Sequence, residues 1–144
     1  MQKLHLKITT PERVLVDEEA REVIVPTKSG QISILPSHTA LVAEITPGEM
    51  LIRNEKEEKV ALVYGGFVEV QEGSKVIILA DSAEHLHELS EKEAEEARNR
   101  AETLMQEVRD DKERFADAEA ELARSLIQLK LLKKHHSHRH TKLN

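Results

Sequence analysis

Cysteine is absent from the 144 residues, which excludes disulfides and thiolate metal sites and leaves nothing that points to an oxidising compartment. Long apolar runs are absent too, since the longest, Val76 to Ala80, is far shorter than the ~18 residues of a membrane span. The first residues, Met1-Gln2-Lys3, lack the basic region and apolar core of a signal peptide. We therefore expect a soluble, cytoplasmic protein that reaches a membrane only by docking onto something in it.

Excess positive charge is also missing, since the net charge is −6. This charge argues against nucleic acid as a partner. The charge is unevenly distributed, however: residues 122–144 carry six basic side chains and no acidic one. A basic tail on an acidic protein indicates an acidic docking surface, on a partner or on the protein itself. The alternative is a solvated terminus without a specific partner.

Residues up to about Ala80 show the period-two pattern of short strands. Leu4, Leu6 and Ile8 alternate with His5 and Lys7, which is typical of a half-buried strand. Similar segments follow near residues 13–16, 21–26, 32–35, 41–45, 49–53, 59–64, 66–71 and 75–80, separated by residues that favour turns. About nine short strands predict an antiparallel sandwich or flattened barrel. They leave no room for the crossover helices of a Rossmann-type nucleotide fold.

Two of these strands, Val60–Tyr64 and Val76–Ala80, are apolar on both faces. A strand in a simple sandwich needs only one apolar face. We therefore expect the second face to be covered, either by the C-terminal half of the chain or by a partner.

From about Ser90 onward the pattern changes to the 3.6-residue period of helices, and glycine and proline disappear. Ser90 and Glu93 form a capping box, in which the serine hydroxyl accepts a hydrogen bond from the backbone N–H of residue 93. Two narrow apolar stripes follow, at Ala94, Ala97, Ala101, Leu104 and Val108, and at Phe115, Ala118, Leu122, Leu126, Leu129 and Leu132.

The charged residues 109–112 between the two stripes are the predicted bend of a helical hairpin. Because the bend contains neither glycine nor proline, the sequence leaves two forms open: a hairpin, and a single helix over residues 90–134. A two-state element and a fixed hairpin are both compatible with this pattern.

The chain contains no motif for catalysis. A phosphate-binding Gly-x-x-x-x-Gly-Lys loop, a nucleophile elbow and a His-Glu-x-x-His helix are all missing, so we expect no enzyme activity of its own. Four histidines in the basic tail could take a divalent metal at modest affinity, but sequence alone gives them no fixed geometry: His135, His136, His138 and His140. We therefore expect no metal site and no cofactor.

Residues 65–70 read Gly-Gly-Phe-Val-Glu-Val and residues 76–84 read Val-Ile-Ile-Leu-Ala-Asp-Ser-Ala-Glu. Together with Thr9-Thr10-Pro11-Glu12, Gly30 to His38 and Ile45-x-Pro47-Gly48, these stretches resemble the epsilon subunit of bacterial and chloroplast F-type ATP synthases along nearly the whole chain. Ser33 and Ser37 stand where that family usually has glycine, and Thr39-Ala40 replaces Ala-Pro. These departures concern local turn geometry.

The resemblance implies an α+β fold that is mainly β: an antiparallel sandwich of about ten strands over residues 1–86, a helical hairpin over 87–134 and a basic, His-rich tail over 135–144. It implies a non-catalytic central-stalk subunit of the F1 sector of a proton-translocating rotary enzyme. Such a subunit couples gamma to the membrane c-ring, inhibits ATP hydrolysis through a mobile hairpin, and lies at the cytoplasmic face of the cell membrane as a peripheral protein.

The resemblance also assigns three contact sites. The c-ring contact falls on the loop containing Lys28, Ser29, Gly30 and Gln31. The gamma contact falls on His38, Leu41, Val42, Ala43 and Glu44, and on the apolar sheet face. The basic residues that would press against an acidic loop of the beta subunit are Arg124, Lys130, Lys133 and Lys134.

Two alternatives remain at this level: an ATP-sensing regulatory module, and a free β-sandwich adaptor outside any motor. Relatives that bind ATP carry Ile/Leu-Asp-x-x-Arg-Ala at the start of the first helix. Here Ser90 replaces the aspartate and Glu93 the arginine, and a carboxylate at that position repels phosphates. We therefore expect poor ATP binding.

Overall fold

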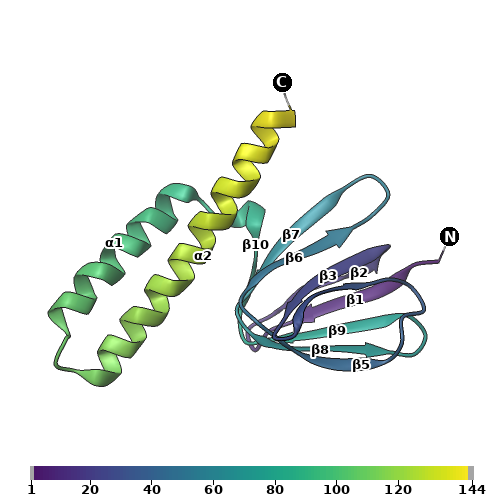
Figure 1. Ribbon diagram of the computed structural model, residues 1–144, viewed down its shortest axis with the longest axis horizontal. Helices are drawn as coiled ribbons and strands as arrows, with labels where there is room; N and C mark the ends of the chain where they lie inside the picture. The colour runs from purple at the N-terminus through teal and green to yellow at the C-terminus, as the bar shows by residue number, and fades with distance from the viewer. Residues whose placement is uncertain (1, 143–144) are drawn as a thin grey trace. The chain divides into compact units, whose positions relative to one another are not determined.

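The computed structural model describes residues 2–142 of the chain, the last six of them by backbone alone, and the chain divides into two compact units between Leu86 and His87. The described residues of the first unit form ten strands (Figure 1). They are β1 (Leu4–Thr9), β2 (Val14–Ala20), β3 (Glu22–Thr27), β4 (Gly30–Ile34), β5 (Leu41–Ile45), β6 (Gly48–Arg53), β7 (Glu58–Val63), β8 (Gly66–Gln71), β9 (Lys75–Ala80) and β10 (Ala83–His85). After a short 3₁₀ turn (Leu86–Glu88), the second unit contains α1 (Glu91–Glu107) and α2 (Lys112–Lys142). The predicted fold, a sandwich followed by a helical hairpin, is confirmed.

The strands form one continuous sheet that folds over on itself. Their order is β10-β7-β6-β3-β5-β8-β9-β1-β2, with β4 attached to β3, and all neighbours are antiparallel except β1 and β9. The alternation seen in the sequence of β1 is realised, because Leu4, Leu6 and Ile8 are fully buried while His5 is exposed. Their apolar side chains meet those of the other strands in a single core between the two layers.

Side chains join the two ends of this sheet. His85 of β10 places Nε2 3.2 Å from the carbonyl oxygen of Leu15 in β2. Lys59 of β7 donates from Nζ to both carboxylate oxygens of Glu18 in β2, at 3.2 and 3.0 Å. This hydrogen bond with Glu18 raises the pKa of Lys59 above its ordinary value of 10.5. Because this pKa is raised in the folded state, the contact stabilises the fold at every pH below the unfolded-state pKa of Lys59. That stabilisation is lost only as the pH rises through the folded-state pKa, so it does not change near neutral pH.

Two consecutive glycines lie at the start of β8, and close packing against β9 requires the second of them, Gly66. Gly66 has φ +124°, and a Cβ atom built on it would lie 2.0 Å from the carbonyl oxygen of Leu79. Gly65 has φ +117°, and its Cβ would lie 2.8 Å from Oδ2 of Asp81. A side chain is therefore excluded at Gly66 by the backbone of β9, and is disfavoured at Gly65 by its positive φ.

Ser37, which stands where glycine is usual in related sequences, adopts the left-handed backbone conformation, with φ 66°. Its N–H donates to the hydroxyl of Ser74 at 2.8 Å, which links the loop after β4 to the turn between β8 and β9. Ser33, the other departure, lies inside β4 opposite Ile24. Ser37 therefore has a backbone conformation that favours glycine, whereas Ser33 lies in a strand, where glycine is unfavourable.

Replacing Ser37 with glycine is expected to stabilise the sandwich by about 0.5–1 kcal/mol. A left-handed conformation costs a residue with a side chain about 1–2 kcal/mol, and the greater flexibility of glycine in the unfolded chain offsets part of that gain. Ser33→Gly is the matched control and should destabilise by about 0.5–1 kcal/mol, because glycine weakens a strand interior. Denaturant unfolding of both variants measures the difference, and shifts of the same sign would contradict the interpretation.

Each helix of the hairpin begins with a capping residue. The hydroxyl of Ser90 accepts from the N–H of Glu93 at 3.3 Å, so the serine half of the predicted capping box is present. The carboxylate of Asp111 accepts from the N–H of Arg114 at 3.1 Å, and the Asp111 carbonyl accepts the first bond of α2, from Phe115 at 2.8 Å. Asp111 is therefore the N-cap of α2, which gives the bend a start signal that the sequence interpretation overlooked.

The apolar stripes face each other across the hairpin, with one correction. Ala94, Ala101 and Ala118 are buried as expected. Leu126 was expected in the second stripe, but it is 48 % exposed and Ser125 is buried in its place. The steps along α2 alternate between three and four residues, so the inward position after Leu122 is 125. The buried Ser125 hydroxyl donates to the Glu121 carbonyl at 2.9 Å, which removes the penalty of burying it.

Candidate interaction surfaces

The outer face of β2, β1, β9, β8 and β5 carries a row of neighbouring apolar side chains. By strand register, Val14 lies beside Thr9, Thr9 beside Leu79, Leu79 beside Phe67, and Phe67 beside Glu44. Phe67 and Leu79 are both 53 % exposed, and Val14 is 51 % exposed. Three large apolar side chains thus lie along one row of the sheet in contact with solvent.

A second row on the same face widens this surface. Val42 lies beside Glu69, Glu69 beside Ile77, and Ile77 beside Lys7. Val42 is the most exposed of the large apolar side chains, at 69 %, and Ile77 is half-buried. We call the set Val14, Val42, Phe67, Ile77 and Leu79 the outer-face patch. Clusters of exposed apolar side chains are common where proteins contact one another, and here Thr9 and Glu69 are interspersed among them.

The strand predicted to contact gamma divides between the core and this patch. Leu41 and Ala43 pack against the core, whereas Val42 and Glu44 point to the outer face. His38 lies in the exposed loop before β5, where its Nδ1 is 2.7 Å from the carbonyl oxygen of Thr39. Leu41 and Ala43 therefore face the opposite side of β5 from Val42 and Glu44.

The sequence did not predict that Phe67 belongs to the outer-face patch. It lies within the Gly-Gly-Phe signature, but the sequence does not reveal that its neighbour across the strands is Leu79. The sequence did indicate an exposed Leu79, because β9 is apolar on both faces. In β7, by contrast, Leu62 on the second face is fully buried.

The turn predicted to contact the c-ring joins β3 to β4 and is tied to β5. Nζ of Lys28 lies 2.8 Å from Oε1 of Glu44, and the Lys28 N–H donates to the Glu44 carbonyl at 3.0 Å. The Thr27 hydroxyl donates to the carbonyl of Gly30, whose φ is +113°. Lys28, Ser29, Gly30 and Gln31 are all exposed, so the turn presents its residues to solvent while Glu44 holds its base.

The four basic residues predicted for inhibition lie on α2, but they do not form one cluster. Lys130, Lys133 and Lys134 are exposed and lie within about one turn of each other on one side of the helix. Arg124 is half-buried and lies on a different side. The structure thus groups three of the four cations.

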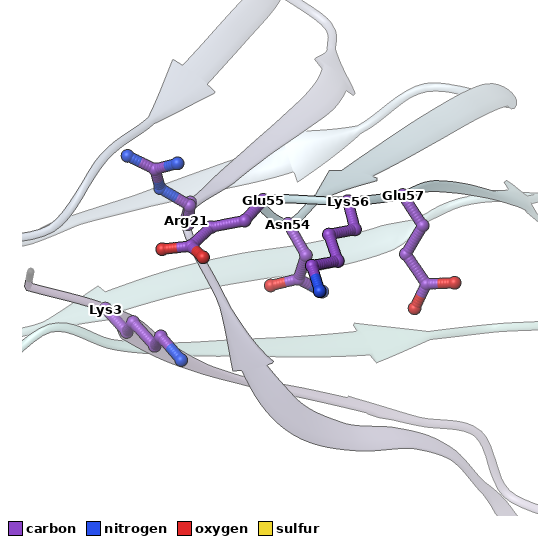
Figure 2. A pocket seen from close by; sticks show the side chains of 6 residues that line it. All are labelled: Lys3, Arg21, Asn54, Glu55, Lys56 and Glu57. Carbon is purple, nitrogen blue, oxygen red and sulfur yellow. The ribbon is translucent and has the colours of Figure 1, made fainter.

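A hollow of about 480 Å³ opens at one end of the sandwich, between the start of β1, Arg21 and the turn joining β6 to β7. It is lined by Lys3, Arg21, Asn54, Glu55, Lys56 and Glu57, and Figure 2 shows carboxylates interspersed among the cations. Mixed charges on an open surface give no preference for an anion or a cation, so this hollow identifies no ligand.

Other chemistry is not supported by the described side chains. Among residues 2–136, no group of three or more histidine, aspartate or glutamate side chains is arranged to hold a metal ion. Within the described part of the chain, neither helix is long and apolar enough to cross a membrane.

Two family models match the two units of the chain. Residues 3–86 match the family described as ATP synthase, Delta/Epsilon chain, beta-sandwich domain. Residues 87–133 match the family described as ATP synthase, Delta/Epsilon chain, long alpha-helix domain. The two matches together cover nearly the whole chain.

Curated relatives extend over the same length. The chain is 38 % identical over 138 residues to the ATP synthase epsilon chain of Dehalococcoides mccartyi strain CBDB1, covering 96 % of this chain and 98 % of the relative. It is 36 % identical over 126 residues to the chloroplastic ATP synthase epsilon chain of Gracilaria tenuistipitata var. liui, covering 87 % and 93 %.

Among solved structures, a chain in the mitochondrial ATP synthase of Euglena gracilis, in its OSCP/F1/c-ring assembly, has the same fold. The TM-score is 0.65 at 20 % sequence identity, and the match covers 94 % of this chain and 80 % of that chain.

Proposed function

Because the chain belongs to the delta/epsilon family of ATP synthase chains, we propose that it works as the epsilon subunit in the rotor of an F-type ATP synthase, at the cytoplasmic face of the membrane. The observation that carries this proposal is the 38 % identity to an ATP synthase epsilon chain over nearly the full length of both chains. The subunit is non-catalytic: it transmits rotation between the gamma subunit and the c-ring.

The outer-face patch is the proposed docking site for gamma. Support comes from its chemistry, since Val42, Phe67 and Leu79 are each more than half exposed. Phe67 and Leu79 are cross-strand neighbours, and Val42 lies diagonally across from Phe67, two residues before Glu44 on β5. Removing such side chains from water favours association by about 25 cal/mol per Å² of apolar surface, from which the entropy cost of association is subtracted. This docking site includes Val42 and Glu44 of the predicted contact and adds Phe67 and Leu79, whereas Leu41 and Ala43 are half-buried on the opposite side of β5.

The exposed turn from Lys28 to Gln31 is the proposed contact with the c-ring. Glu44 binds Lys28 from the strand that also borders the outer-face patch. The two proposed contacts are therefore joined by one strand, β5, which suits a part that carries torque between gamma and the ring.

An ATP-sensing role receives less support. The Ser90 hydroxyl accepts the Glu93 N–H, so the start of α1 is complete without a ligand. The carboxylate of Glu93 also brings negative charge to a position where a nucleotide would need a cation.

Co-purification from detergent-extracted membranes tests the main proposal. An affinity-tagged copy of the full chain should elute together with the alpha, beta and gamma subunits of the enzyme. Elution of the chain alone, while the other three subunits elute together, would show that it is a free adaptor domain and not a rotor part.

Inhibition of ATP hydrolysis is proposed to depend on the basic end of α2. Replacing Arg124, Lys130, Lys133 and Lys134 with alanine removes the three lysines that would together face an acidic loop of the beta subunit, and Arg124 on a different side of the helix. Each exposed ion pair is worth about 0.2–1 kcal/mol, so losing several predicts a rise in hydrolysis by the assembled enzyme of at least about threefold. The steady-state hydrolysis rate at low ionic strength measures this effect.

The matched control replaces four cations elsewhere in the hairpin with alanine: Lys92, Arg98, Arg100 and Lys112. This variant removes the same charge and should leave hydrolysis unchanged. Added salt should weaken inhibition by the wild-type chain, because exposed charges are screened beyond about 8–10 Å. Equal hydrolysis by both variants and the wild type would show that the basic end is merely solvated.

A further inference from the structure

Several charged side chains on the outer face of the sandwich are paired within the sandwich itself. Oε1 of Glu44 in β5 lies 2.8 Å from Nζ of Lys28. Oδ1 of Asp17 in β2 lies 2.6 Å from Nε2 of His5 in β1. Side chains paired in this way do not require a charged partner when another protein covers them.

Glu69 of β8 and Lys7 of β1 differ from these pairs. Both side chains belong to the outer face, and both are half-buried. Within residues 2–136, the carboxylate of Glu69 makes no hydrogen bond or ion pair, and neither does the ammonium group of Lys7. In this part of the chain water alone is left to solvate the two charges.

The two charges lie among the apolar side chains of the outer-face patch. Ile77 of β9 lies between them, opposite Glu69 on one side and opposite Lys7 on the other. Val42 lies on the other side of Glu69, in β5. Since neighbouring strands are about 4.8 Å apart, the backbones of Glu69 and Lys7 are about 10 Å apart across β9. One acidic and one basic group thus flank a single apolar side chain.

A protein that covers this patch removes water from both charges. An ionised group that loses its water is strongly unfavourable unless it gains a partner of opposite charge. The covering surface therefore needs a cation beside Glu69 and an anion beside Lys7. Apolar side chains alone do not distinguish one orientation of the covering protein from the reverse orientation, whereas two opposite charges do.

We propose that gamma places a basic side chain against Glu69 and an acidic side chain against Lys7, and that these two contacts fix its orientation on the sheet. This inference rests on the proposed docking of gamma at the outer-face patch. It adds the charge pattern of the gamma surface, with the two charges on either side of the position that receives Ile77. A fixed orientation suits a subunit that transmits rotation.

Binding of the full chain to an alpha–beta–gamma complex depleted of this subunit tests the charge pattern. The variant E69K/K7E keeps the net charge but reverses the two signs, so each site would bring like charges together. Its affinity should be at least about 100-fold weaker than that of the wild type, which corresponds to about 2.7 kcal/mol.

The matched control is E19K/K75E. Glu19 and Lys75 flank His5 on the same face, one strand on either side, just as Glu69 and Lys7 flank Ile77. Both control side chains are exposed and lie outside the outer-face patch. The control also keeps the net charge, and its affinity should stay within about threefold of the wild type.

Neutral replacements separate the two contacts. Glu69→Gln and Lys7→Met should each weaken binding at least about tenfold, because each leaves a charge of gamma without its partner. Their effects should multiply in the double variant, because the two side chains meet different groups of gamma. A double variant no weaker than either single variant would show that the two side chains pair with each other, which overturns the proposal. The urea midpoints of all variants should match that of the wild type, so that a loss of affinity is not a loss of folding.

The outcomes also separate this proposal from the one on which it rests. If the wild type binds the complex and E69K/K7E binds equally well, the charge pattern is wrong and the rotor function stands. If E19K/K75E is weakened as much as E69K/K7E, the effect belongs to the whole face and the specific contacts are wrong. If the wild type does not bind the complex, both proposals are wrong.

Discussion

Replacing Gly66 with alanine should destabilise the sandwich by about 4 kcal/mol or more, a large part of the roughly 5–15 kcal/mol stability of an ordinary domain. The added Cβ would lie 2.0 Å from the Leu79 carbonyl oxygen and 2.8 Å from the Ala80 Cα. Both are backbone atoms of β9, a strand paired on both sides, so neither can move without disturbing the sheet. The φ of +124° adds strain that only glycine avoids.

Urea unfolding followed by circular dichroism measures this loss. Gly73→Ala is the matched control, because Gly73 also has a positive φ, of +84°, but no atom lies within 4 Å of its added Cβ. The control should lose only about 1 kcal/mol, the cost of the backbone conformation. A loss of the same size in both variants would show that close packing against β9 is not the reason for the glycine.

The second large effect is expected at the outer-face patch. The double variant Phe67→Asp/Leu79→Asp should weaken binding to the gamma subunit at least about 100-fold, or about 2.7 kcal/mol. The two side chains are cross-strand neighbours at the centre of the patch, so docking would bury two carboxylates in place of two apolar groups. Burying an unpaired charge costs about 3–5 kcal/mol, which exceeds the predicted loss.

The stability of this variant needs to be measured alongside its affinity. Both side chains are 53 % exposed in the wild type, so the free energy of unfolding should change far less than the binding energy. Leu126→Asp is the matched control, since Leu126 is 48 % exposed and lies on the hairpin. Retained binding by the patch variant, or equal weakening by Leu126→Asp, would place the gamma contact elsewhere.

The sequence predicted the elements of this fold because its local signals agree with one another. Alternating Leu4, Leu6 and Ile8 identify β1, and the Ser90 cap marks the start of α1. Such signals depend on nearest neighbours along the chain. They therefore predicted the sandwich and the change to helices without knowledge of which strands pair.

What the sequence did not reveal depends on pairing and on phase. The outward direction of Phe67 and Leu79 acquires meaning only when β8 and β9 are neighbours. In α2 the buried position is occupied by Ser125 and not by Leu126, a difference of one residue along the helix. Hydrophobicity alone predicts Leu126 at this position, which is wrong. The carboxylate of Asp111 looked like one of several charges at the bend, yet it is the one that caps α2.

The Asp111 cap also determines what would happen if the two helices became one. The inward positions of the hairpin run 94, 97, 101, 104, 108, 115, 118, 122, 125 and 129, in steps of three and four that a residue at 111 would complete. An unbroken helix would therefore carry a heptad repeat across the bend, the seam of a left-handed coiled coil. Asp111 would be its only ionised member, so a partner helix that received this seam would need a cation opposite it.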